Sequence, residues 1–167
     1  MTHRRLLSAA LLLGLAAPLS AQTVWLVRHA EKAADGSADP GLSAAGQRRA
    51  QALAEALAGA GMARVISSDR RRTRDTALPL ALQRGLAVQP TAAPAAVLAA
   101  ELTAAAAASP VLVVGHSNTV PALLQALGVP PPAEWPDACY DRLYWVDLAT
   151  TPPRWALLRY GEPSPGC

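Results

Sequence analysis

The stretch VWLVRHAEK, residues 24–32, places a run of apolar residues directly before a cluster of charged ones. Residues 23–27 have the length and composition of a short strand that is buried on both faces of a sheet. Arg28 and His29 follow this strand without an intervening turn. Because ligands of open α/β sheets bind outside the carboxyl ends of the strands, Arg28 and His29 are candidates for a binding site.

Beyond this first strand, helical and extended patterns alternate along the chain. Apolar residues at helical spacing predict helices over 43–60, 69–82, 95–108 and 119–127. Shorter apolar runs predict strands over 64–67, 86–88, 110–114, 142–148 and 154–160, the last two forming a hairpin. Ser43 is the expected N-cap of the first helix, and Ser68 or Asp69 that of the second. The alternation predicts an α/β fold, a three-layer α/β/α sandwich with a mostly parallel sheet.

The amino terminus has the composition of an export signal. Residues 1–21 combine Arg4 and Arg5 with an apolar run and small residues before Ala21. This pattern predicts a cleaved signal peptide, one domain over 22–167, and a periplasmic or extracellular location. The alternative is an N-terminal membrane anchor, but the apolar run is shorter than the roughly 18–20 residues that span a bilayer.

The composition excludes several classes of protein. The 167 residues are 51% hydrophobic and 16% charged, which is typical of one globular domain. The formal charge of +3 falls to +1 once Arg4 and Arg5 are removed with the signal peptide. The remaining chain therefore shows neither the basic footprint of a nucleic-acid-binding protein nor a segment for stable membrane association.

Three polar clusters follow predicted strands, and parallel strands would bring them to one edge of the sheet. They are Arg28-His29, the segment 67–72 and the segment 115–118. Arg72 and its neighbours begin a helix whose positive end favours an anion, and a guanidinium group binds two phosphate oxygens at once. His29 and His116 are the two histidines outside the signal peptide. A neutral imidazole can attack phosphorus, while arginines and a second, protonated histidine neutralise the transferring oxygens. A metal site would need further ligands, and the nearby arginines would repel a cation, so we predict no metal and no cofactor.

With these motifs assembled, the chain resembles the histidine phosphatase superfamily, which has the phosphoglycerate-mutase-like fold. Residues 28–31, Arg-His-Ala-Glu, resemble the Arg-His-Gly-Glu signature of the family. Residues 42–46, Leu-Ser-Ala-Ala-Gly, are similar to its Leu-Thr-x-x-Gly segment. Residues 67–77 resemble its Ser-Ser-Pro-Leu-x-Arg-Thr-x-Gln-Thr-Ala segment, and residues 114–119 its second-histidine motif. The resemblance implies a short, exported phosphatase rather than a mutase, because no long insertion separates the motifs.

The resemblance implies a role for each matched residue. His29 would be the nucleophile, and the phosphate would be held by Arg28, His29, Arg72, His116 and Ser117. Many members carry a glutamate after the third strand as the general acid, but residues 88–94 contain no carboxylate. Glu31 is our candidate acid, with Asp35 and Asp39 as further options.

The predicted function is metal-independent hydrolysis of phosphomonoesters or phosphoramidates through a phosphohistidine on His29. The substrate would be a small phosphorylated molecule or a phosphoprotein, with inorganic phosphate as the product ligand. The alternative is a non-catalytic phosphate-binding module on the same fold, which the missing acid favours. Cys139 and Cys167 are either bridged or free, and the sequence leaves both options open.

Overall fold

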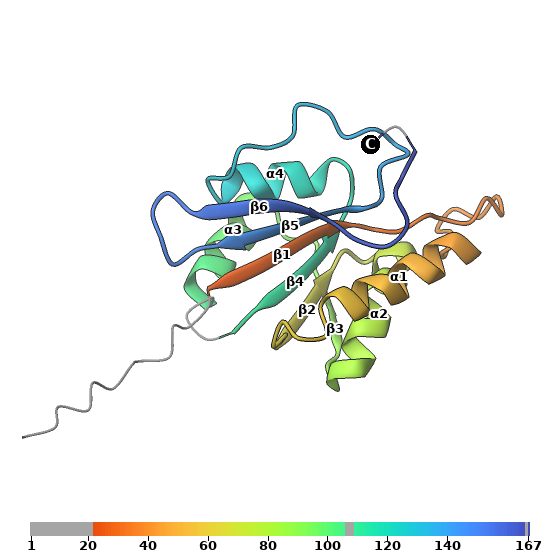
Figure 1. The fold of residues 1–167 in the computed structure, drawn as a ribbon, viewed down its shortest axis with the longest axis horizontal. Helices are drawn as coiled ribbons and strands as arrows, with labels where there is room; N and C mark the ends of the chain where they lie inside the picture. Colours follow the sequence, from red (N-terminus) through yellow and green to blue (C-terminus); the bar gives the residue numbers. More distant parts are fainter. Residues whose placement is uncertain (1–21, 106–108, 166) are drawn as a thin grey trace, which may run out of the picture.

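The computed structural model describes residues 22–105, 109–165 and 167, so the predicted signal peptide lies outside the described residues. Its centre is a six-stranded sheet in the order β3-β2-β4-β1-β5-β6 (Figure 1). The strands are β1 (Thr23–Arg28), β2 (Arg64–Ser67), β3 (Val88–Pro90), β4 (Val111–Gly115), β5 (Arg142–Asp147) and β6 (Arg154–Arg159). The helices are α1 (Ala44–Ala56), α2 (Arg71–Arg84), α3 (Ala95–Ala105) and α4 (Thr119–Ala126).

The sheet is mixed, with a parallel part and an antiparallel part. The neighbouring strands β3, β2, β4 and β1 run parallel to one another. Strand β5 pairs antiparallel with β1, and β6 pairs antiparallel with β5, which confirms the predicted hairpin. All four parallel strands therefore end at the same edge of the sheet.

Helices cover both faces of the sheet, as the three-layer prediction requires (Figure 1). Along β4, Val111 and Val113 join the core that α3 and α4 cover, whereas Leu112 and Val114 join the core under α1 and α2. A strand that is buried on both faces has a continuous apolar sequence, and this explains the unbroken apolar run of β4. None of the described helices is long and apolar enough to span a bilayer.

Several predicted boundaries were wrong, including that of the first helix, which ends at Ala56 rather than residue 60. The third strand begins at Val88 rather than residue 86, because Gly85 adopts φ 66° after α2 and the Leu86 N–H still donates to the Ala81 carbonyl. Neither Ser68 nor Asp69 caps α2. The N-cap is Arg70, whose side chain makes no capping bond. The predicted N-cap of the first helix is confirmed, since the Ser43 hydroxyl accepts a hydrogen bond from the Gly46 N–H at 3.1 Å.

Candidate active site

The strand register brings the three predicted polar clusters to one edge of the sheet. Arg28 of β1 is level with Gly115 of β4, and the His29 N–H donates to the Gly115 carbonyl at 2.9 Å. On the other side of β4, Ser67 of β2 is level with Val114. The ends of these strands surround a cavity of about 420 Å³. It is lined by Arg28, His29, Lys32, Arg70, Arg72, His116, Ser117, Asn118, Thr119 and Asp137.

His29 is held in one tautomer by its own backbone. Its side chain is buried, and Nδ1 lies 2.8 Å from the Ala30 carbonyl oxygen. A carbonyl can only accept, so Nδ1 carries the proton and Nε2 keeps its lone pair. The pKa of His29 is lowered to about 4, mainly by burial. The hydrogen bond to Ala30 raises this pKa, whereas the charges of Arg28, Arg72 and His116 lower it further. At neutral pH His29 is therefore an uncharged imidazole, and none of the described residues makes a hydrogen bond to its Nε2.

His116 faces His29 across the cavity, with the two ring centroids 5.3 Å apart. Its Nδ1 lies 3.4 Å from Nη2 of Arg72, and its Nε2 lies 2.8 Å from the Ser68 hydroxyl. A guanidinium can only donate, so Nδ1 accepts and Nε2–H donates to Ser68. Burial lowers the pKa of His116 to about 4, helped by the charges of Arg72, Arg70 and Arg28. A bound phosphate would oppose this effect and favour the protonated form that the sequence predicted.

Arg28 is fixed by the segment that precedes β5. Its Nη1 donates to the carbonyls of Pro136 at 3.2 Å, Asp137 at 3.0 Å and Cys139 at 3.5 Å. Its guanidinium also lies over the Tyr140 ring, 4.5 Å from the centroid. Nε of Arg28 is buried and has no hydrogen-bond partner among the described residues, while the residue as a whole lines the cavity.

A disulfide between Cys139 and Cys167 ties the last residue of the chain to this segment. The two Cα atoms lie 5.5 Å apart, within the usual range for a bridge. Of the two options that the sequence left open, the bridged one is present. It fastens the backbone that receives the hydrogen bonds of Arg28.

Arg72 is oriented by an aspartate from a distant loop. Its Nη1 lies 3.7 Å from the Asp39 carboxylate, which also accepts from the Arg71 N–H at 3.1 and 3.2 Å. Asp39 therefore accepts the hydrogen bond from the first N–H group of α2, which Ser68 or Asp69 was expected to accept as the N-cap. The Ser68 hydroxyl is instead bonded to His116 and to the Thr73 hydroxyl at 2.8 Å.

The rim of the cavity holds cations that sequence reasoning left out of the site. Lys32 and Arg70 both line the cavity, and both are exposed. The amino ends of α2 and α4 begin at the same edge, with their positive dipole ends toward the cavity. In the sequence, only the clustering of arginines in segment 67–72 indicated that Arg70 could belong to the site, and no pattern indicated this for Lys32. Together these groups make the cavity an anion-binding site.

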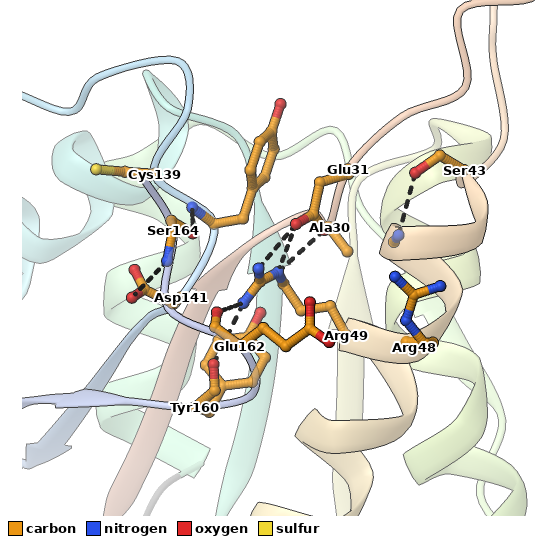
Figure 2. A network of polar contacts seen from close by, with 12 residues as sticks. Ala30, Glu31, Ser43, Arg48, Arg49, Cys139, Asp141, Tyr160, Glu162 and Ser164 are labelled. Atoms are coloured by element: carbon orange, nitrogen blue, oxygen red, sulfur yellow. Dashed lines mark hydrogen bonds and ion pairs between the residues drawn. The ribbon is translucent and has the colours of Figure 1, made fainter. Parts of the chain in front are cut away.

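The structure places Glu31 outside the residues that line this cavity. Its carboxylate accepts from Nε and Nη2 of Arg49 at 2.8–3.0 Å (Figure 2). Arg49 also donates to the carbonyls of Tyr160 at 3.3 Å and Glu162 at 2.9 Å. Burial works against the charge of Arg49, but its hydrogen bonds to Glu31 and the attraction of that carboxylate outweigh burial and raise its pKa. The geometry thus supports a structural role for Glu31 and offers no support for a role as the acid.

Gly46 explains why the Leu-Ser-Ala-Ala-Gly segment belongs to the site. The start of α1 packs directly on the backbone that follows His29, and the Ser43 N–H donates to the Glu31 carbonyl at 2.9 Å. A Cβ atom at Gly46 would lie 2.2 Å from that same oxygen. Only glycine allows α1 to approach this closely, so the segment positions the chain next to the candidate nucleophile.

The lowered pKa values of the two histidines predict that acid destabilises the protein. An unfolded histidine takes up a proton near pH 6.5, whereas His29 and His116 resist protonation down to about pH 4. The unfolded chain then binds more protons, so the free energy of unfolding is highest above pH 6.5 and falls as the pH drops toward 4. Urea unfolding between pH 7 and pH 5 would measure this decline. A His29→Asn/His116→Asn double variant should show a shallower decline, and parallel curves for the two proteins would contradict the prediction.

Among the described residues, no group of three or more His, Cys, Asp or Glu side chains is placed to hold a metal ion. Asp137 is the one carboxylate among the ten residues lining the cavity. It is exposed and lies 3.6 Å from Nη2 of Arg28. The chemical resources of the cavity are therefore two neutral imidazoles, several cations and one peripheral carboxylate.

Comparison with known proteins finds a matching family model and several similar structures. A model of the histidine phosphatase superfamily (branch 1) matches residues 24–95, which contain Arg28, His29 and Arg72. The structure of the protein histidine phosphatase SixA complexed with tungstate superposes with a TM-score of 0.67 at 22% identity, covering 86% of this chain and 97% of that chain. The fold is that of the histidine phosphatases.

Two further structures share the histidine phosphatase fold. A mycobacterial glucosyl-3-phosphoglycerate phosphatase has a TM-score of 0.61 at 23% identity, covering 83% of this chain and 97% of its own. A phosphoserine phosphatase from Entamoeba histolytica, a mutant in complex with phosphoserine, has a TM-score of 0.64 at 13% identity, covering 83% and 95%. No curated protein sequence matches the chain. The histidine phosphatase fold of this chain thus spans nearly the full length of each of these phosphatases.

Proposed function

We propose that the protein is a metal-independent histidine phosphatase that hydrolyses phosphomonoesters or phosphoramidates through a phosphohistidine on His29. The observation that carries this proposal is the fixed tautomer of His29. Its Nδ1–H is bound to the Ala30 carbonyl, and its neutral Nε2 is left free beside Arg28, Arg72 and His116. A buried, neutral imidazole surrounded by cations suits attack on a phosphoryl group better than it suits a structural role.

The proposed reaction has two displacements at phosphorus. In the first, the Nε2 lone pair of His29 forms the P–N bond while the bond to the leaving group breaks with its electron pair. The phosphorylated imidazole carries a positive charge, and Arg28, Arg72 and His116 neutralise the phosphoryl oxygens. In the second, water attacks phosphorus and the P–N bond breaks, which returns neutral His29 and releases inorganic phosphate and a proton.

The leaving group receives little help from a carboxylic acid in this mechanism. Glu31 is bonded to Arg49, and Asp137 is exposed on the Arg28 side of the cavity. Loss of a general acid costs typically 10²–10⁴ in rate, and this cost is smallest for leaving groups that are stable without a proton. The proposed substrates are accordingly phosphoramidates and esters of acidic alcohols.

Similar proteins support a phosphate ligand. The SixA structure holds tungstate, and a mycobacterial glucosyl-3-phosphoglycerate phosphatase has been solved with inorganic phosphate. Both anions have the tetrahedral arrangement of oxygens that the cations of this cavity would bind. We take phosphate as the product ligand of the proposed reaction, and a small phosphorylated molecule or phosphoprotein as its substrate.

The proposal includes export of the protein. Residues 1–21 would be removed as a signal peptide, leaving the phosphatase domain of residues 22–167 in the periplasm or outside the cell. The disulfide between Cys139 and Cys167 supports this location, since such bonds persist in oxidising compartments and are rare in the cytosol.

Trapping the intermediate tests the proposed function. The purified protein is mixed with p-nitrophenyl phosphate in EDTA and quenched in alkali, where phosphohistidine survives, before peptide mapping. We expect phosphate on His29 and steady turnover in EDTA. Turnover that stops in EDTA and returns with a divalent ion would overturn metal independence. Phosphate binding with neither turnover nor labelling would favour the phosphate-binding module instead.

A further inference from the structure

A second cavity lies next to the first and differs from it in chemistry. It has a volume of about 370 Å³ and opens between the ends of β2 and β4, the segment after β3, and helices α3 and α4. No charged residue is among those described as lining it, in contrast to the five charged residues around the His29 cavity. Its apolar walls come from Ala92, Ala93, Pro94, Leu98, Val113 and Leu123.

The two cavities are neighbours and share part of their walls. Asn118 and Thr119, at the start of α4, line both of them. Ser68 lines the apolar cavity, and its hydroxyl is bonded to Nε2 of His116, which lines the charged one. A molecule with one anionic and one apolar end would therefore find complementary surroundings for both.

The sheet order sets where the apolar cavity lies relative to His29. Because β4 lies between β1 and β2, His116 stands between His29 and Ser68. In phosphoryl transfer the attacking and leaving atoms are roughly in line with phosphorus. The leaving group therefore departs on the side of phosphorus away from His29, and the apolar cavity is a neighbouring space on the side of His116 away from His29.

We infer that this cavity, defined by residues 67–68, 91–95, 113–115 and the start of α4, binds the leaving group of the substrate, and that this group is apolar and of the size of an aromatic ring. The inference rests on the proposed function. An apolar cavity of about 150 Å³ already takes up benzene, so the present volume suffices for a ring with substituents. An aryl leaving group also suits a site without an acid, since a phenolate departs more readily than an alkoxide.

Residues 91–94, Thr-Ala-Ala-Pro, are the specificity determinants in this view. The backbone at Ala93 is held by its N–H bond to the Thr91 hydroxyl at 3.1 Å, which turns the two alanines and Pro94 into one wall of the cavity. A carboxylate on this wall would make it polar. With small apolar residues, the wall selects by shape and hydrophobicity instead.

Binding of non-hydrolysable phosphonates tests this inference without depending on turnover. Calorimetry on the purified protein compares benzylphosphonate with methylphosphonate. We expect benzylphosphonate to bind about tenfold or more tightly, since even one methylene in an apolar pocket is worth 10-fold or more. The Ala92→Phe variant, which fills the cavity, should reduce this ratio to about threefold or less while leaving the affinity for methylphosphonate unchanged.

Ala96→Phe is the matched control, because Ala96 is exposed on α3 and lines neither cavity. It should behave as the unsubstituted protein does, and thermal unfolding should show both variants folded. Equal binding of the two phosphonates, or equal behaviour of Ala92→Phe and Ala96→Phe, would overturn the leaving-group site and leave the proposed phosphatase intact. Failure of both phosphonates to bind would overturn the inference together with the phosphate site on which it rests.

Discussion

The His29→Ala variant is expected to lose turnover of p-nitrophenyl phosphate by on the order of 10⁴-fold or more. Removal of a nucleophile costs this much in enzymes whose catalytic residues act as a unit. Nε2 of His29 keeps its lone pair for reaction in the charged cavity, because the ring proton lies on Nδ1, which donates to the Ala30 carbonyl. Steady-state kinetics would measure the loss, with Gln83→Ala on the exposed face of α2 as a control that keeps full activity.

The same variant should still bind phosphate, which separates chemistry from binding. Arg28 and Arg72 are positioned by contacts that do not involve His29, namely the carbonyls of the segment 136–139 and the Asp39 carboxylate. Calorimetry with inorganic phosphate would check this point. Turnover within tenfold of the unsubstituted protein would contradict the assignment of His29 as nucleophile, and His116→Ala would be the next variant to measure.

The Arg49→Met variant is expected to lose about 1–3 kcal/mol of its free energy of unfolding. Arg49 is buried and Glu31 is partly exposed, so removing Arg49 leaves a carboxylate without its hydrogen-bond donors and only partly reached by water. The carbonyls of Tyr160 and Glu162 also lose their donor, so the turn after β6 loosens (Figure 2). Urea unfolding at pH 7 would measure the change.

Two companion variants make this prediction specific. Arg49→Met/Glu31→Gln should recover part of the lost stability, since it removes the unpaired charge. Glu31→Gln alone keeps a hydrogen-bond acceptor for Arg49 and tests the predicted acid. If Glu31 is structural, the folded Glu31→Gln variant should hydrolyse alkyl and nitrophenyl phosphates in the same ratio as the unsubstituted protein. A selective loss of 10²-fold or more with the alkyl phosphate would restore Glu31 as the general acid.

Local sequence patterns predicted many of the helices and strands of the fold. The apolar run before Arg28 predicted β1, the alternation along residues 142–160 predicted the β5-β6 hairpin, and Ser43 predicted the start of α1. These features depend on residues that are close in sequence, so periodicity and capping chemistry reveal them. The predictions that failed concerned boundaries where distant residues intervene, as at α2, whose first N–H group donates to Asp39 rather than to a cap of its own.

By itself, the sequence determined that strands alternate with helices and that Arg28, His29, Arg72 and His116 follow or flank strand ends. It did so because each of these features is a short pattern along the chain. Only the tertiary structure decided that β4 lies between β1 and β2, which brings His116 within 5.3 Å of His29. The tertiary structure also decided that Glu31 forms an ion pair with Arg49, that Lys32 and Arg70 line the charged cavity, and that an apolar cavity lies next to Ser68. Each of these depends on which segments pack side by side, and strand order and packing join residues too far apart in the chain for any local periodicity to record.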